Sequence, residues 1–203
     1  MTLPAPHVVL EGHGVRLEPL DPSTLGTPVW GELAAALGHP EVFAGGWGGG
    51  PAAFREGAVL EQWLQTYVPV HSGQPYLVRS EAGDVIGTSS IGDIDPAREA
   101  AHIGWTAYAP SVWGTTVNPA CKLLMLEHLF AHGCGRVKLQ ADERNARSRA
   151  AILKLGATFE GITRREQPRA DGSWRDTAVY SVIVDDWERV REGLLARLAS
   201  ATD

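Results

Sequence analysis

The amino-acid sequence predicts an α+β fold in which a mixed, mostly antiparallel sheet is flanked by helices on both faces. Two kinds of pattern lead to this prediction. Short segments that alternate apolar and polar residues predict strands, and longer stretches with apolar residues three or four positions apart predict helices. The predicted order is a strand, two helices, mostly antiparallel strands, a strand–helix–strand unit and a terminal hairpin. The length of 203 residues fits one domain, which we assign to residues 1–203.

In the first half of the chain, alternation predicts a strand over residues 15–20. Apolar spacing then predicts helices over 30–37 and 54–67. Residues 45–50, which we call the glycine segment, contain too many glycines for a regular element. Two strands over 76–80 and 85–91, joined by a turn at 82–84, and a further strand over 100–109 complete this half.

In the second half, the strongest helix prediction covers residues 118–132. Asn118 suits the N-cap of this helix, and Pro119 suits its first helical position. A helix over 145–155 should end at Gly156, a residue typical of the position after a helix. The other elements predicted here are a strand over 136–141, a hairpin of strands 159–166 and 174–184 with a turn at 170–172, and a helix over 187–198.

The bulk composition narrows the class of function. The formal net charge of −6 argues against a general nucleic-acid binder. Because the sequence has no apolar run of about 18 residues and residues 1–10 lack the pattern of a signal peptide, we expect neither a membrane span nor a secretory leader. The spacing of Cys121 and Cys134 matches no zinc or redox motif. We therefore expect buried thiols, no metal site and a cytoplasmic protein.

The segment before the helix predicted at 118–132 carries a candidate anion site. A strand, a loop of small residues and a capped helix together present free backbone N–H groups at the positive end of a helix dipole, an arrangement that binds phosphate. An ordinary strand-to-helix turn has the same pattern, so the residues alone leave both interpretations open. The loop, called here the 113–118 loop, consists of Trp113, Gly114, Thr115, Thr116, Val117 and Asn118.

Several short motifs follow one another over about eighty residues. They are His102-Ile103-Gly104-Trp105, the 113–118 loop, Arg136-Val137-Lys138-Leu139, Asn145-Ala146-Arg147-Ser148, Leu155-Gly156-Ala157, Glu160-Gly161 and Gly172-Ser173-Trp174-Arg175-Asp176. In order and spacing, this series resembles the GCN5-related N-acetyltransferase superfamily. Within that superfamily it is similar to the branch that acetylates the N-terminal alanine or serine of ribosomal proteins.

The resemblance implies a fold and a chemistry. The fourth and fifth predicted strands, at 100–109 and 136–141, would splay apart, and the pantetheine of acetyl-CoA would lie in the gap. The 113–118 loop would hold the pyrophosphate. A backbone N–H near a bulge at Thr106, Ala107 or Tyr108 would polarise the thioester carbonyl. A primary amine, on a protein N-terminus or a small molecule, would attack directly, and a homodimer is compatible with the sequence.

The loop departs from the superfamily pattern Gln/Arg-x-x-Gly-x-Gly/Ala. The leading basic or amide residue is replaced by Ser111, and Thr116 stands where glycine or alanine is usual. Threonine resists positive φ and adds bulk, but its hydroxyl could donate a hydrogen bond to phosphate. This departure supports an alternative function, a module that binds acyl-CoA or another ligand without turnover.

The resemblance also suggests acid and base candidates. Asn145 would contact pantetheine, although an N-cap role explains it equally well. Ser148 would protonate the departing thiolate, because Ile152 occupies the position where many relatives have a tyrosine. His102 stands where many relatives have a glutamate base, and Glu166 is its rival. Both could instead be structural, so the base stays open.

Two further features allow a structural and a functional interpretation. Four basic residues on or beside the predicted 145–155 helix could grip the 3′-phosphate of the cofactor or could form a solvated helix face. The glycine segment with Trp47 could close over an acceptor or could be a surface loop. The basic residues are Arg144, Arg147, Arg149 and Lys154.

Overall fold

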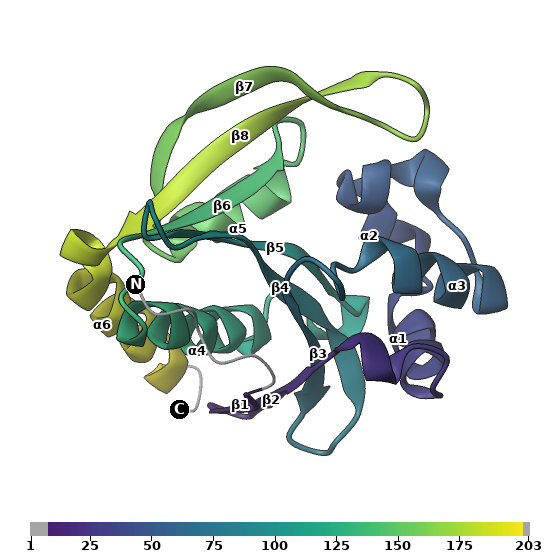
Figure 1. Ribbon diagram of the computed structural model, residues 1–203, viewed down its shortest axis with the longest axis horizontal. Coiled ribbons are helices and arrows are strands. Elements are labelled where there is room, and N and C mark those ends of the chain that lie inside the picture. The colour runs from purple at the N-terminus through teal and green to yellow at the C-terminus, as the bar shows by residue number, and fades with distance from the viewer. Residues whose placement is uncertain (1–7, 201–203) are drawn as a thin grey trace.

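The computed structural model describes residues 8–200, which build an eight-stranded sheet with helices on both faces (Figure 1). The strand order is β1-β2-β3-β4-β5-β6-β8-β7. The strands are β1 Leu10–Gly12, β2 Val15–Pro19, β3 Gln74–Ser80, β4 Val85–Asp95, β5 Ala100–Tyr108, β6 Arg136–Asp142, β7 Thr158–Pro168 and β8 Trp174–Ile183. The helices are α1 Val29–Leu37, α2 Pro40–Ala44, α3 Gly57–Tyr67, α4 Val117–Ala131, α5 Ala146–Lys154 and α6 Trp187–Ala199.

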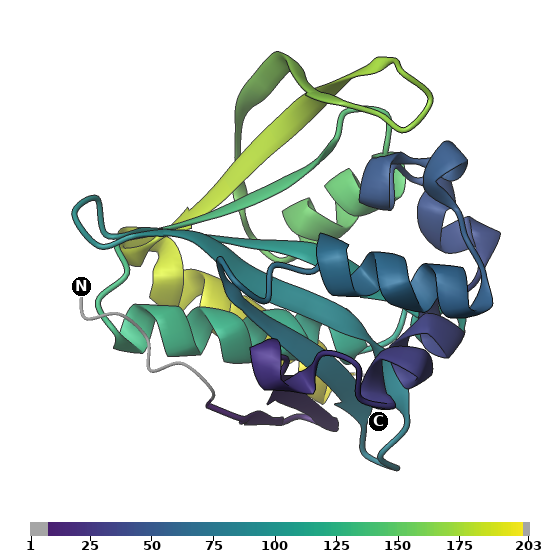
Figure 2. The same ribbon diagram turned by 45° about the vertical axis from the view of Figure 1, so that its right-hand side comes forward.

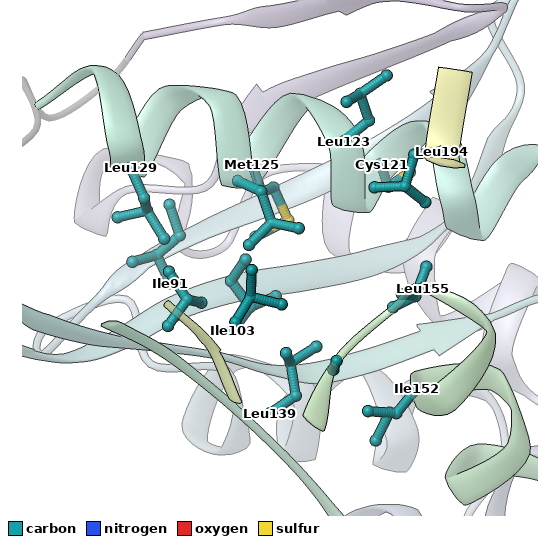
Figure 3. Packing of buried hydrophobic residues seen from close by; sticks show 14 of the residues in the cluster. Ile91, Ile103, Cys121, Leu123, Met125, Leu129, Leu139, Ile152, Leu155 and Leu194 are labelled. Carbon is teal, nitrogen blue, oxygen red and sulfur yellow. The ribbon is translucent and has the colours of Figure 1, made fainter. Parts of the chain in front are cut away.

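The two faces of the sheet bury separate hydrophobic clusters. Side chains alternate along a strand, so in β3 Tyr76 and Val78 pack into the cluster on the α4 face, whereas Leu77 packs into the cluster on the α1 face. Figure 3 shows α4 lying over the sheet, with Met125 and Leu129 near Ile91 and Ile103 of β4 and β5. The mixed sheet covered on both faces confirms the predicted fold class.

One strand pair is parallel, and it is short. β5 pairs with β6 only from Ala100–His102 to Arg136–Lys138, whereas every other neighbouring pair in the sheet is antiparallel. Beyond these three residue pairs the strands diverge, and β6 runs on beside β8 (Figure 2). β5 and β6 are the fourth and fifth strands of the sequence prediction, so the predicted splay is confirmed.

A β-bulge interrupts β5 just past the point of divergence. Thr88 pairs with Ala107 and Ser90 with Gly104, so Trp105 and Thr106 together oppose Ser89. Trp105 has a φ of 51°, a left-handed conformation that is rare for a bulky side chain. The bulge residues Trp105 and Thr106 adjoin the 106–108 stretch, where a backbone N–H near a bulge was expected from sequence.

The N-cap prediction for α4 is wrong. Thr116 is already helical, with φ −75° and ψ −11°, and the helix begins at Val117. The Ala120 N–H donates to the Thr116 carbonyl at 2.9 Å, so the first helical hydrogen bond already starts before Asn118. Asn118 and Pro119 then occupy the second and third helical positions, where the missing proline N–H costs no intrahelical bond.

Other boundaries shift for local reasons. The sequence interpretation missed β1 and the five-residue α2, which are too short to show a period. α3 starts at Gly57, three residues later than predicted, because Glu56 is extended and Gly57 has a φ of 53°. Cys121 and Cys134 are free and buried as expected, and burial raises the pKa of the Cys121 thiol to about 11. Across residues 8–200, no helix is both long and apolar enough to cross a membrane.

Candidate active site

A cavity of about 640 Å³ lies where β5 and β6 diverge. Its walls come from these two strands, the 113–118 loop, the start of α5, the glycine segment and the β7–β8 hairpin. We distinguish two halves. The loop half is lined by Trp113, Gly114, Thr115, Asn118, Asn145, Arg147 and Ser148, and the hairpin half by residues 45–49, Tyr67, Asp142, Arg169 and Arg175.

The 113–118 loop is held by its own hydrogen bonds. Trp113 Nε1 donates to the Tyr108 carbonyl at 2.9 Å, and Thr115 Oγ1 donates to the Val112 carbonyl at 2.7 Å. The loop residue with a left-handed backbone is Gly114, at φ 79°. Thr116, being helical, does not need glycine-like freedom, and neither Thr116 nor Val117 lines the cavity. The expected conflict between threonine and a positive φ therefore does not arise.

The basic residues around α5 do not act as one cluster. The Arg147 guanidinium lies over the Trp113 ring, 3.5 Å from its centroid, and both Arg147 and Lys154 line the cavity. Arg149 instead donates to Tyr180 Oη at 3.1 Å and to the Glu143 carbonyl at 3.2 Å. Arg144 also lies outside the lining. Two of the four predicted cations are therefore available to a ligand in the loop half.

Asn145 caps α5 and lines the cavity at the same time. Its Oδ1 accepts the Ser148 N–H at 2.9 Å, as the N-cap interpretation requires. Its amide nitrogen lies against Gly45, where an added Cβ would come within 2.6 Å of it. Ser148 lies in the first turn and lines the cavity, and Ile152, which is 93% buried, lines it one turn farther along the helix. The structure brings both predicted residues to the same wall.

A buried lysine supports the bulge. Lys122 of α4 is 4% exposed, and its Nζ donates to Ser89 Oγ at 2.8 Å and to Thr106 Oγ1 at 2.7 Å. Burial lowers the pKa of Lys122 to about 8. The sequence interpretation missed this residue, although it is the lone charged residue between Val117 and Leu126. The predicted bulge residues Thr106, Ala107 and Tyr108 all line the cavity, as does Lys122.

His102 and Glu166, the two base candidates, differ in position. His102 is 3% exposed and lines the cavity, and its Nδ1 lies 3.2 Å from Asp93 Oδ2. Burial lowers the pKa of His102 to about 4; Lys138 and Lys122 act in the same direction, and Asp93 opposes them. His102 is therefore neutral at pH 7, but its pKa lies below the near-neutral value expected from sequence. Glu166 is exposed on β7 and does not line the cavity.

The glycine segment roofs the hairpin half. Trp47 packs edge-on against Tyr67, with ring centroids 5.2 Å apart, within a cluster of aromatic rings that includes Trp63. The Gly49 carbonyl accepts the Ala170 N–H at 3.0 Å, which joins the segment to the tip of the β7–β8 hairpin. A Cβ at Gly46 would lie 3.1 Å from Asp142. The glycine segment therefore packs against both the β7–β8 hairpin and Asp142 of β6.

A buried ion pair forms one wall of the hairpin half, and the sequence interpretation did not find it. Arg169 Nε and Nη2 donate to the two carboxylate oxygens of Asp142 at 2.8 and 3.0 Å. Burial by itself would raise the pKa of Asp142, but hydrogen bonds from Arg169 and the Arg144 N–H hold it below its ordinary value. Arg175 lines the same wall. Asp142 and Arg169 are 27 positions apart, and no local pattern predicts their contact.

The chain is similar to proteins of known fold and family. The family model described as an acetyltransferase (GNAT) domain matches residues 28–158. A solved structure described as an acetyltransferase is 31% identical, with a TM-score of 0.81 over 96% of this chain and 95% of the other. A GCN5-related N-acetyltransferase from Brucella melitensis is 28% identical, with a TM-score of 0.83 over 96% of this chain and 87% of the other.

A more distant likeness concerns the fold alone. RimJ from Mycobacterium smegmatis, solved in complex with CoA-disulfide, is 19% identical, with a TM-score of 0.70 over 97% of both chains. No protein among curated sequences matches this chain significantly. Within residues 8–200, no group of three His, Cys, Asp or Glu side chains could hold a metal ion.

Proposed function

We propose that this chain, which belongs to the GNAT acetyltransferase family, is an acetyl-CoA-dependent N-acetyltransferase that transfers the acetyl group directly to a primary amine. The observation that carries the proposal is the cavity at the divergence of β5 and β6. One half of it offers backbone N–H groups and cations, and the other half offers buried polar side chains. The bulge residues and His102 line the same cavity.

The loop half fits the cofactor. Gly114 and Thr115 line the cavity just before the N-terminus of α4, where free backbone N–H groups and the helix dipole favour phosphate. Arg147 and Lys154 add two positive charges to the same wall. Asn145 keeps its amide N–H₂ group for a pantetheine carbonyl, because capping uses only its oxygen. Bound acetyl-CoA would supply an activated acetyl thioester.

The transfer needs one C–N bond to form and one C–S bond to break. A backbone N–H at the bulge, in the 105–108 stretch of β5, would stabilise the developing negative charge on the acetyl oxygen. Ser148 would give its hydroxyl proton to the departing thiolate and take one back from water. The proton lost by the attacking amine would pass to His102, directly or through water. Glu166 is less suited to this role, because it is exposed and outside the cavity.

The hairpin half would receive the acceptor amine, which the glycine segment and Trp47 would cover. Acceptors of either predicted class, protein N-termini or small amines, share the amino group that the chemistry requires. The likeness to RimJ is one of fold, so assignment to the ribosomal-protein branch stays a proposal. A homodimer and a cytoplasmic location also remain predictions.

A thiol-release assay with acetyl-CoA and a panel of amines tests the proposal. We expect CoA to bind with micromolar affinity or better, about −8 kcal/mol, in calorimetry. We also expect CoA release that depends on an amine and yields an acetylated product in mass spectrometry. CoA binding without transfer to any amine would favour the non-catalytic module. Absence of binding at millimolar CoA would exclude both the acetyltransferase and a module that binds acyl-CoA.

A further inference from the structure

The cavity is far more cationic than the protein that contains it. The whole chain has a formal net charge of −6. Among the described residues that line the cavity, Asp142 is the lone carboxylate, and the cations are Lys122, Arg147, Lys154, Arg169, Arg175 and Arg197. Phosphates of a bound cofactor would offset the charge of Arg147 and Lys154 in the loop half. They do not account for the charge in the hairpin half.

Arg175 is the unpaired cation of the hairpin half. Its Nε is buried and has no hydrogen-bond partner among residues 8–200, and its guanidinium makes no ion pair there. The carboxylates of Asp142 and Glu166 both attract it, but Asp142 already accepts hydrogen bonds from Arg169 on both oxygens, and Glu166 lies outside the cavity lining. A half-buried guanidinium whose buried Nε–H lacks a partner is a costly arrangement that an anionic ligand would relieve.

The strand register places Arg175 on the face where the acceptor would lie. Asp142 of β6 is paired with Thr177 of β8, and Arg175 lies two residues before Thr177, so it shares their face. Farther along β6, Lys138 is on the same face as Asp142 and is paired with His102 of β5. His102 and Arg175 therefore lie on the same face of the sheet, and both line the cavity.

We propose that Arg175 binds an anionic group of the acceptor, so that the acceptor is a small zwitterionic amine carrying a carboxylate or a phosphate. The guanidinium offers several N–H donors in one plane, which match either group in a bidentate geometry. Two features favour a small molecule over a polypeptide. The Gly49–Ala170 hydrogen bond joins the glycine segment to the hairpin over this half, and the cofactor would fill part of the 640 Å³ volume. The positive surroundings disfavour polyamines. This inference rests on the proposed function.

Matched substrates test the charge requirement. Each pair should share a skeleton and differ in the anionic group: phenylalanine with phenylalaninamide, glycine with glycinamide, and O-phosphoethanolamine with ethanolamine. We expect the anionic member of at least one pair to have the higher kcat/KM by about 10–100-fold, the range of a charge-assisted hydrogen bond. The first two pairs test carboxylate and the third tests phosphate. Spermidine and an alanine-initiated peptide complete the panel.

Variants assign the preference to one residue. Arg175→Met should reduce the preference for the anionic member to near one by lowering its kcat/KM, while the neutral member and CoA affinity change little. Arg175→Lys should keep part of the preference. Arg164→Met is the matched control, because Arg164 is an exposed arginine of the same hairpin that does not line the cavity. It should behave like the wild type.

The outcomes separate this inference from the proposed function. Transfer to neutral amines, spermidine or the peptide with no effect of Arg175→Met would overturn the inference and leave the acetyltransferase proposal standing. If no amine is acetylated, the proposed function fails, and calorimetry of the three anionic compounds with the CoA-saturated protein still tests the subsite. Binding that Arg175→Met abolishes would support it, and no binding, or binding equal in both proteins, would contradict it.

Discussion

The two halves of the cavity are built in different ways. The loop half uses consecutive residues of the 113–118 loop and the first turns of α4 and α5, so much of its chemistry resides in backbone N–H groups. The hairpin half is assembled from the glycine segment and from side chains that are spread between positions 47 and 175. Backbone groups tolerate changes of side chain, whereas a wall of assembled side chains does not. We therefore expect substitutions in the hairpin half to disturb the structure of the site more than substitutions in the loop half.

Arg169→Met should produce the largest effect. The substitution leaves Asp142 buried, at 4% side-chain exposure, without its charge partner. We expect a loss of about 3 kcal/mol in the free energy of unfolding, because removing one partner of a buried pair strands the other charge. Urea denaturation would measure it, with Arg164→Met as a control for losing an exposed arginine. A loss below about 1 kcal/mol would show that the hairpin half does not depend on this pair.

Lys122→Met should stabilise the folded protein and lower its activity. Burial holds the pKa of Lys122 at about 8 against an ordinary 10.5, so removing the amine should add about 2–3 kcal/mol to the free energy of unfolding at pH 7. The unfolded chain binds more protons between pH 8 and 10.5, so wild-type stability should rise with pH there and that of the variant should not. We expect kcat/KM to fall about tenfold as Thr106 loses its support. Equal activity would remove Lys122 from the site.

His102 makes stability sensitive to acid. Its pKa is about 4 in the folded protein and about 6.5 when exposed, so the unfolded chain binds the extra proton between these values. Stability should therefore fall as pH decreases, by about 2 kcal/mol from pH 7 to pH 5, and His102→Gln should lose less. If His102 is also the base, the acid limb of kcat/KM should lie near pH 4 and vanish in the variant. An unchanged limb would exclude it.

Ser148→Ala tests the loop half with a smaller change. A thiolate is already a fair leaving group, so we expect kcat to fall about tenfold, at or below the low end of general-acid effects. CoA affinity should hold, because the Ser148 N–H that Asn145 caps is unaffected. Calorimetry and steady-state kinetics measure the two quantities separately. A normal kcat, with chemistry shown to limit the rate, would mean that thiolate departure needs no help from this residue.

Thr116→Gly should have the smallest effect. Thr116 is helical and outside the cavity lining, and glycine keeps the backbone N–H at this position. A change of a few tenths of a kcal/mol, less than about twofold in the Kd for CoA, is expected from the N-cap position alone. A tenfold gain or loss in affinity would show that the side chain at position 116 contacts the cofactor after all.

Local patterns predicted the fold and pointed to the residues of the loop half, but in the hairpin half they pointed to the glycine segment alone. α4 and α5 show a helical period in the sequence, and Gly156 marks the end of α5. Residues close in sequence are enough to predict such elements. The burial of His102, and with it the low pKa, depends on strands and helices packed around it. The left-handed Trp105 has no sequence signal, because the register of β4 against β5 imposes it. Arg175 is recognised as a candidate site residue only in the structure, where the β7–β8 hairpin places it in the cavity lining.

The Gly49–Ala170 hydrogen bond also bears on the synthesis of the chain. The two residues lie 121 positions apart (170 minus 49), so at a typical ribosomal rate roughly 6–24 s pass between their incorporation. During that interval the β7–β8 hairpin is not yet complete, so the glycine segment lacks this partner. Its aromatic partners Phe43, Trp63 and Tyr67 are close in sequence and can pack together early. This local cluster would keep apolar rings away from chaperones and aggregates until the nascent chain supplies the rest of the site.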